Sequence, residues 1–174
     1  MARGQRMIVR PAQSGDIPAI AAIYAHHVLR STATFDVDPP DEAHWHERLA
    51  LLTAKDWPFL VAERDAACVG YAYAAQFRDR PAYVYACENS IYVRPGEEGR
   101  GVGTQLLRAL VTAAKAAGFR QMIAVIGGAE PASAALHAKL GFVEVGRIRH
   151  VGYKFGRLLD TLYMQRSLDQ SSRS

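Results

Sequence analysis

The chain has 174 residues, of which 49% are hydrophobic and 22% charged, and its formal net charge is +4. This length and balance suit one globular domain with a sizeable core and argue against a disordered chain. No apolar run is long enough to cross a bilayer, and the basic start, Met1 to Arg10, lacks the apolar core of a secretion signal. We therefore expect a cytoplasmic protein with no membrane partner.

The first half of the chain alternates between strand and helix signals. Ser14 or Asp16 is placed to cap a helix that has Pro18 in its first turn, and Asp41 is placed to cap the next helix. The elements predicted are a strand at 7–11, a helix to about Val28, a loop at 31–40, a helix from 41 to before Pro58, and a hairpin of strands at 59–63 and 68–75.

The second half begins with a polar and aromatic loop at 76–83. The elements predicted after it are a strand at 85–93, a glycine-rich stretch at 94–103, a helix with Val102, Leu106, Leu110 and Ala113 on one side that stops at Gly118, a strand at 122–126, a helix from Pro131 to Gly141, and strands at 142–151 and 158–167. This order predicts an α/β fold with a mixed sheet of about seven strands flanked by about four helices. We expect a single domain over 7–168, with flexible ends at 1–6 and 169–174.

Cysteines, histidines and basic residues show no pattern of a metal or nucleic-acid site. Cys68 and Cys87 form neither a disulfide framework nor a metal quartet, so we interpret them as buried free thiols. His44 and His46 are two residues apart on a predicted helix and point in different directions. Lysines and arginines are scattered among acids, without a basic stripe. We expect no metal and no nucleic-acid partner.

The most informative segment runs from Val93 to Thr104, between a strand and the start of a helix. Its glycines allow backbone N–H groups to approach a ligand, and the positive end of the helix favours an anion. The lysine of a P-loop is absent, and the G-x-G-x-G pattern follows the fourth strand rather than the first, so neither a nucleotide triphosphate nor a dinucleotide is indicated. A phosphate-bearing ligand of another kind is predicted.

Two segments carry a family resemblance. Residues 98–103, Glu-Gly-Arg-Gly-Val-Gly, resemble the Q/R-x-x-G-x-G/A pyrophosphate loop of the GCN5-related N-acetyltransferases, and 136–142, Leu-His-Ala-Lys-Leu-Gly-Phe, resemble their L-Y-x-x-L-G-F signature. Within this superfamily the chain is similar to the phosphinothricin N-acetyltransferase group, which includes acetylators of methionine sulfone and methionine sulfoximine. The similarity runs from about Ile8 to Leu168 and is also carried by residues 23–28, 34–35, 77–83, 88–93 and 151–157.

The resemblance implies an acetyl-CoA-dependent transferase that acetylates the primary amine of a small amino-acid-like substrate. It makes Glu88 the general base, acting directly or through a water. His137 stands where many relatives have the tyrosine that protonates the departing thiolate, and a histidine packed on a short helix is the alternative interpretation. The positions implied to contact acetyl-CoA are Ile91, Tyr92, Val93, Gly99, Arg100, Gly101, Val102, Gly103, Thr104 and Glu130.

The substrate side is implied less directly. Arg78 and Arg80 lie on a loop near the base, where an arginine fork suits a carboxylate, although two solvated loop arginines are the alternative. Thr34, Phe35 and Tyr83 resemble pocket positions of the group, although such aromatic residues are often core. The group commonly forms dimers, so the resemblance also implies a homodimer.

Two residues depart from the family pattern. Glu98 stands where the family has glutamine or arginine, so an acid would lie beside the pyrophosphate, with Arg94 and Arg100 available to offset it. Glu130 stands where the group usually has an asparagine that bonds the cofactor. Both changes predict weaker acetyl-CoA binding. The acids also keep a non-catalytic acyl-CoA-binding sensor open as a function. A protein or peptide N-terminal acetyltransferase with the same cofactor is a further alternative.

Overall fold

A computed structural model describes residues 7–169. Its elements are β1 Ile8–Pro11, α1 Ile17–Arg30, α2 Glu42–Ala54, β2 Phe59–Arg64, β3 Ala67–Gln76, β4 Ala86–Val93, α3 Val102–Ala116, β5 Gln121–Gly127, α4 Pro131–Lys139, β6 Val143–Lys154 and β7 Arg157–Ser167, with short 3-10 turns at Ser14–Asp16 and Pro81–Tyr83. The predicted fold class is confirmed. Of the ends predicted to be flexible, 1–6 and 170–174 lie outside the described residues.

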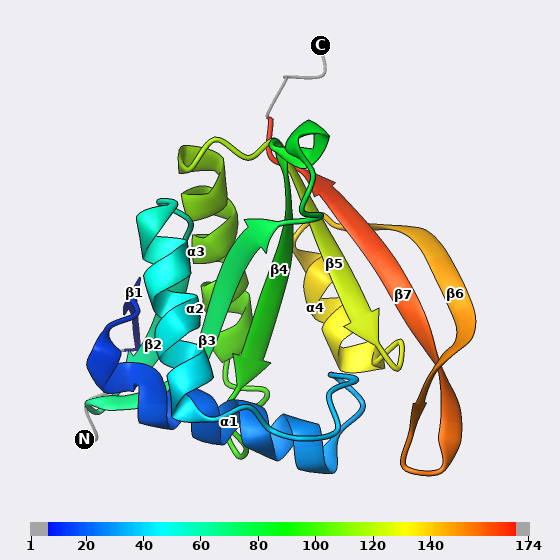
Figure 1. Ribbon diagram of the computed structural model, residues 1–174, viewed down its shortest axis with the longest axis horizontal. Coiled ribbons are helices and arrows are strands. Elements are labelled where there is room, and N and C mark those ends of the chain that lie inside the picture. Colours follow the sequence, from blue (N-terminus) through cyan, green and yellow to red (C-terminus); the bar gives the residue numbers. More distant parts are fainter. Residues whose placement is uncertain (1–6, 170–174) are drawn as a thin grey trace.

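The seven strands form one sheet in the order β1-β2-β3-β4-β5-β7-β6. Only the central pair, β4 and β5, is parallel, and its register covers just Ala86–Asn89 against Gln121–Ala124. Beyond these residues the two strands separate, and they are visibly apart at the far end of the sheet (Figure 1). We call this opening between the unpaired ends of β4 and β5 the fork. It leaves backbone groups in the middle of a sheet without strand partners.

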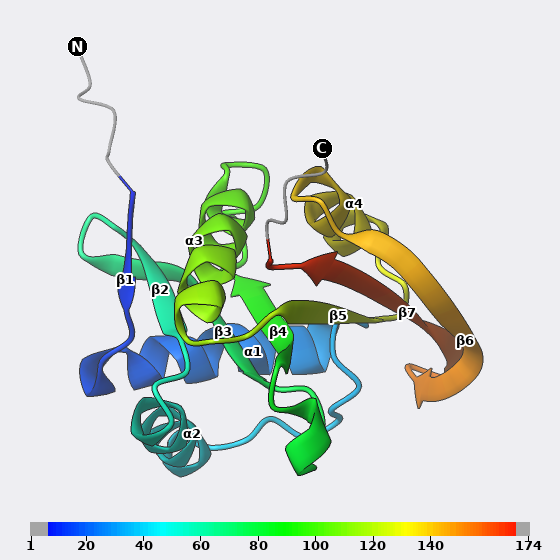
Figure 2. The ribbon, with the colours of Figure 1, turned by 90° about the horizontal axis from the view of Figure 1, so that it is seen from above.

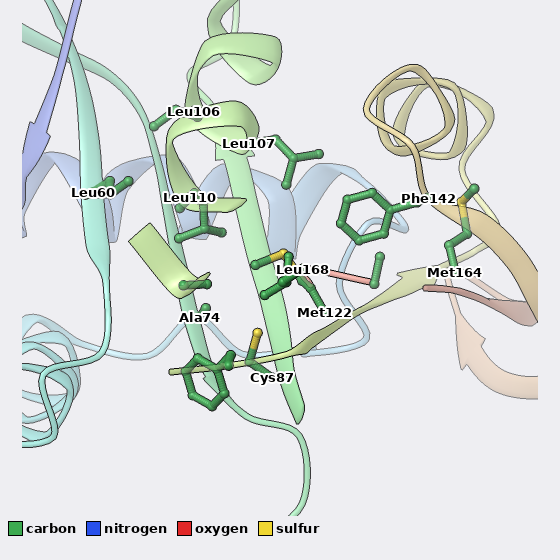
Figure 3. Packing of buried hydrophobic residues seen from close by; sticks show 14 of the residues in the cluster. Leu60, Ala74, Cys87, Leu106, Leu107, Leu110, Met122, Phe142, Met164 and Leu168 are labelled. Carbon is green, nitrogen blue, oxygen red and sulfur yellow. The ribbon is translucent and has the colours of Figure 1, made fainter. Parts of the chain in front are cut away.

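The helices cover the sheet in two layers, with α3 and α4 on one face and α1 and α2 on the other (Figure 2). On the first face, Leu106, Leu107 and Leu110 of α3 are fully buried over the side chains of β4 and β5, among them Cys87 and Met122 (Figure 3). Burying each such leucine stabilises the fold by about 1.5–3 kcal/mol. Ala113, on the predicted apolar side of α3, is partly buried against the same core, and Ala114 is fully buried in it.

Helix starts follow the capping residues only in part. The Asp41 carboxylate accepts a hydrogen bond from the His44 N–H at 2.9 Å and caps α2 as predicted. Asp16 precedes α1 but makes no cap bond to it; its carboxylate instead pairs with Arg10 at 2.8 Å, which lowers the pKa of Asp16. None of the described helices is long and apolar enough to span a membrane.

The last hairpin is longer than predicted. The sequence indicated a strand ending at Val151, but β6 continues to Lys154. The ladder is irregular between Ile148 and Gly152, and His150 there has a φ of 53°. A bulge of this kind absorbs extra residues within a strand, and strict alternation in the sequence does not reveal it.

Candidate active site

The fork opens into a cavity of about 700 Å³ between β4, β5, the start of α3 and α4. It brings together residues that the sequence predicted from separate segments. The predicted site residues that line it are Glu88, Ile91, Tyr92, Val93, Gly99, Gly101, Val102, Gly103, Thr104, Glu130 and His137. The carboxyl groups of Glu88 and Glu130 and the backbone of the glycine loop therefore face one space.

The start of α3 is built to meet an anion. Gly101 stands at the N-cap with a φ of +80°, a conformation that favours glycine, and no side chain caps the helix there. Within residues 7–169, the N–H groups of Val102, Gly103 and Thr104 have no hydrogen-bond acceptor in the protein. Three free donors and the positive helix end together form a site for a phosphate.

Both acids of the glycine loop, Glu97 and Glu98, have hydrogen-bond partners in the protein. The Glu97 carboxylate pairs with Arg64 and lies 3.6 Å from Arg100, and the Glu98 carboxylate accepts the Gly96 N–H at 2.7 Å. Neither Glu98 nor Arg100 lines the cavity, and the Arg100 side chain is 61% exposed. The Arg100 guanidinium thus lies beside Glu97, and its predicted contacts with the cofactor and with Glu98 stay predictions.

Strand β4 turns alternate backbone groups toward the fork. The Phe77 N–H donates to the Ala86 carbonyl and the Arg94 N–H to the Val69 carbonyl, so the even-numbered residues of β4 bond to β3. The N–H groups of Ile91 and Val93 therefore face the fork. The N–H of Tyr92 faces β3, but Tyr92 also lines the cavity, so its contact with the cofactor stays a prediction.

His27 of α1 also reaches the fork, which the sequence did not predict. Its Nε2–H donates to the Val93 carbonyl at 2.9 Å, and the side chain lines the cavity. The histidine pair His26-His27 stood within the segment that resembles the family, but nothing in its spacing pointed to the β4 backbone. His27 satisfies a carbonyl that has lost its strand partner.

Glu88 lies on β4 just before the strands separate, with its side chain 35% exposed. Burial raises the pKa of its carboxyl group, and the nearby Arg78 guanidinium, 3.8 Å from Oε2, opposes this. A carboxylate with a raised pKa is a better proton acceptor near neutral pH than an ordinary one.

His137 enters the cavity wall from α4 but is only 2% exposed. Burial lowers the pKa of its imidazole, so the ring is neutral at pH 7. Glu130, at the N-cap position of the same helix, accepts a hydrogen bond from the Thr32 hydroxyl group. Glu130 also lines the cavity, so its contact with the cofactor stays a prediction.

Arg78, Arg80 and Tyr83 lie outside the cavity on the exposed loop that joins β3 to β4. The Gln76 side-chain amide shapes this loop by donating to the carbonyls of Arg78 at 2.7 Å and Arg80 at 2.8 Å. The Tyr83 ring packs against Phe77 with a centroid distance of 5.8 Å. Of this group, the structure brings only Arg78 within ion-pair distance of Glu88.

Thr34 and Phe35 are held in the loop after α1 and do not line the cavity. The Thr34 hydroxyl group lies 2.7 Å from the Tyr24 hydroxyl group, and Phe35 packs so closely on Gly152 that a side chain there would not fit. The buried Lys154 ammonium donates to the carbonyls of Ser31 at 2.9 Å and Thr34 at 2.8 Å. The sequence gave no sign that Lys154 anchors this loop.

No group of three histidine, cysteine or acidic side chains within the described part of the chain is arranged to hold a metal ion. What the fork offers instead is free backbone donors and the Glu88 carboxylate, since the Glu97 and Glu130 carboxylates that also line the cavity are bonded to Arg64 and Thr32. Such a site binds an anionic ligand and moves a proton.

Comparisons with known proteins agree with this chemistry. The acetyltransferase (GNAT) domain family matches residues 9–163. A phosphinothricin N-acetyltransferase of Alcaligenes faecalis is 46% identical over 162 residues, covering 92% of this chain and 82% of the relative. An L-methionine sulfoximine/L-methionine sulfone acetyltransferase of Salmonella typhimurium is 37% identical over 167 residues, covering 94% and 96%.

A solved structure shares the fold closely. The crystal structure of a GNAT superfamily phosphinothricin acetyltransferase from Sinorhizobium meliloti, in complex with acetyl-CoA, superposes with a TM-score of 0.92 at 44% identity, covering 97% of this chain and 91% of that chain. The chain therefore belongs to the GNAT acetyltransferase family. The enzyme class predicted from the sequence, an acetyl-CoA-dependent N-acetyltransferase, is confirmed.

Proposed function

We propose that this enzyme acetylates the primary amine of a small amino-acid-like substrate of the phosphinothricin, methionine sulfone or methionine sulfoximine type. The observation that carries the proposal is the position of Glu88, which faces the same cavity as the free N–H groups of α3 and lies 3.8 Å from Arg78. The Glu88 carboxylate thus lies between the phosphate site at the start of α3 and the Arg78 guanidinium, which is suited to bind the carboxylate of a substrate. The names of the relatives support the substrate class.

In this proposal the backbone binds the co-substrate. The N–H groups of Val102, Gly103 and Thr104 meet the pyrophosphate of acetyl-CoA, while those of Ile91 and Val93 face the pantetheine arm and the acetyl carbonyl. The cavity of about 700 Å³ provides room for the arm between β4 and β5. Fixed N–H groups of this kind stabilise the negative charge that develops on the carbonyl oxygen.

Glu88 supplies the proton transfer. Its carboxylate accepts a proton from the substrate ammonium, and the free amine then attacks the thioester carbonyl. The C–N bond forms, the C–S bond breaks, and the nitrogen gives up its remaining extra proton as the thiolate takes one up. The raised pKa of Glu88 suits it to this exchange near neutral pH.

The substrate's carboxylate, in the same proposal, is recognised by the loop between β3 and β4. Arg78 and Arg80 carry guanidinium groups that bind carboxylates through paired N–H donors. Thr34, Phe35 and Tyr83 remain proposed pocket residues that shape the surroundings of the loop. Arg78 then has two partners, because it touches Glu88 before the substrate's carboxylate arrives.

We further propose that the enzyme is a homodimer that uses the hairpin of β6 and β7. Strand β6 is an edge of the sheet, and large apolar side chains are exposed along the hairpin. These residues are Val143, Val145, Ile148, Val151, Tyr153, Phe155 and Leu158. Light scattering on the purified protein should give twice the chain mass, and a single-chain mass would refute the dimer. A cytoplasmic location is likewise proposed, and cell fractionation tests it.

The test of the reaction is free-thiol release from acetyl-CoA across a panel of amines. The panel holds phosphinothricin, methionine sulfone, methionine sulfoximine, the common amino acids and short peptides, each with the wild type, Glu88→Gln and Glu98→Gln. We expect turnover with a free amino-acid analogue and a loss of about 10²–10⁴-fold in Glu88→Gln, the usual contribution of a general base. Release with peptides alone would indicate a protein N-terminal acetyltransferase, and acetyl-CoA binding without turnover a sensor.

A further inference from the structure

His137 is anchored on both sides of its ring. Nδ1 lies 2.8 Å from the Ser133 carbonyl one turn earlier in α4, and Nε2 lies 3.0 Å from the side-chain oxygen Oδ1 of Asn89 on β4. The edge of the ring also packs against Phe142 at a centroid distance of 4.9 Å. The imidazole therefore has little freedom to turn toward a ligand in the cavity.

No protonation state leaves an N–H of His137 free. The Ser133 carbonyl oxygen and the Asn89 Oδ1 oxygen only accept, so a proton on Nδ1 is donated to Ser133 and a proton on Nε2 is donated to Asn89. In the charged ring both N–H groups are used, one by each partner. A proton donor for a thiolate needs an N–H that faces the reacting atoms, and this geometry does not provide one.

Asn89 occupies the point where the fork begins. It is the last β4 residue in register with β5, paired with Ala124, and it also pairs with Ala74 of β3. Its side chain is buried, at 6% exposure, on the α4 side of the sheet, whereas the adjacent Glu88 side chain points to the opposite side. The His137–Asn89 bond thus joins α4 to β4 at the residue next to the proposed base.

We propose that His137 is a positioning residue that acts through Asn89, rather than the donor that protonates the thiolate. The bond fixes where β4 leaves β5, and with it the direction of Glu88 and of the Ile91 N–H. The roles of Glu88 and the Ile91 N–H in this proposal rest on the proposed function, but the contact between His137 and Asn89 is independent of the reaction. The thiolate then takes its proton from the amine nitrogen or from solvent.

Two amide variants separate the roles. In His137→Gln the side-chain amide reaches the place of Nε2 and can still bond Asn89, whereas in His137→Asn it reaches only the place of Nδ1. Neither amide is an acid. We expect kcat of His137→Gln within about 3-fold of wild type and a fall of about 10–100-fold in His137→Asn, the range seen when a supporting hydrogen bond is lost. The KM for acetyl-CoA should stay within about 2-fold in both.

The double variant checks that the effect passes through Asn89. Asn89→Leu should lower kcat as much as His137→Asn, and combining the two should lower it no further, because both remove the same contact. Equal losses in His137→Gln and His137→Asn, or additive losses in the double variant, would overturn the proposal. Melting curves of each variant show whether it is folded.

Nuclear magnetic resonance tests the contact without turnover. With ¹⁵N-labelled histidine, we expect the His137 ring to show a single tautomer with a hydrogen bond at each nitrogen, as the contacts to Ser133 and Asn89 require. A ring that exchanges between tautomers, or a nitrogen without a hydrogen bond, would refute the assignment even if no amine were acetylated. A wild type that acetylates nothing would instead refute the proposed function and leave this test intact.

Discussion

The two sides of Glu88 are built in different ways. On the proposed co-substrate side, backbone N–H groups at the start of α3 and along β4 face the cavity of the fork. On the proposed substrate side, Arg78 and Arg80 lie on an exposed loop, and their backbone carbonyls accept hydrogen bonds from the Gln76 side chain. Backbone donors bind any acyl-CoA of the right shape, whereas side chains on a loop can change without disturbing the sheet. The comparison explains how relatives with differently named substrates share one fold.

The largest effect on the co-substrate side is expected from Gly103→Val. A Cβ atom at Gly103 would lie 3.0 Å from the Leu136 side chain, so the larger residue pushes α3 and α4 apart or extends into the cavity of the fork. Overpacking of about 1–3 kcal/mol should weaken acetyl-CoA binding by about 10–100-fold. Calorimetric titration measures this. Gly146→Val is the control, because a Cβ there meets no neighbour within 4 Å; similar affinities in the two variants would contradict the backbone site.

On the substrate side, Arg78→Leu should raise the KM for the amine by about 10-fold or more, the worth of a charge-assisted hydrogen bond. The same variant should also shift the acid limb of the pH profile of kcat/KM to higher pH. Arg78 lowers the pKa of Glu88, so its removal raises that pKa further, and the base remains protonated up to a higher pH.

The control is Arg80→Leu. Within the described residues Arg80 makes no ion pair with Glu88, so we expect its KM to rise while the acid limb stays in place. A pH profile of Arg78→Leu that matches the wild type would refute the coupling between Arg78 and Glu88.

A smaller effect is expected from Gln76→Leu, which removes both hydrogen bonds to the loop carbonyls. Because the arginines remain but their loop loosens, the KM for the amine should rise by about 3–10-fold, corresponding to about one net hydrogen bond. The affinity for acetyl-CoA should be unchanged, since Gln76 does not line the cavity. Steady-state kinetics with each substrate varied in turn provide the measurement, and a parallel loss on both sides would indicate general unfolding.

The smallest effect is expected from Glu98→Gln. Its carboxylate is turned back onto the Gly96 N–H, and an amide oxygen can accept the same bond. Acetyl-CoA affinity should change by less than about 2-fold, within the usual range for surface substitutions. Glu97→Gln is the contrasting variant, because it leaves the half-buried Arg64 without its carboxylate and should lower the melting temperature. A large gain in affinity for Glu98→Gln would restore the expectation that Glu98 opposes the pyrophosphate.

The sequence predicted best what depends on local pattern. The element order, the cap of α2 and the glycine loop all follow from spacing within a few residues, and the structure contains them. The fork, the His27 bond to β4 and the Lys154 anchor depend on segments that are distant in the chain, so no spacing reveals them. Arg100 was assigned to the cofactor because of its place in the motif, and spacing alone does not reveal that its guanidinium lies 3.6 Å from Glu97.

Cys87 shows a last consequence of the core beneath the fork. The thiol is fully buried one residue before Glu88, and burial raises its pKa to about 12. Only about one molecule in 10⁵ then carries the thiolate at pH 7, and the thiolate is the form that attacks thioesters, oxidants and alkylating reagents. The sulfhydryl directly before Glu88 in the chain is therefore expected to stay protonated and to react slowly with thioesters and oxidants.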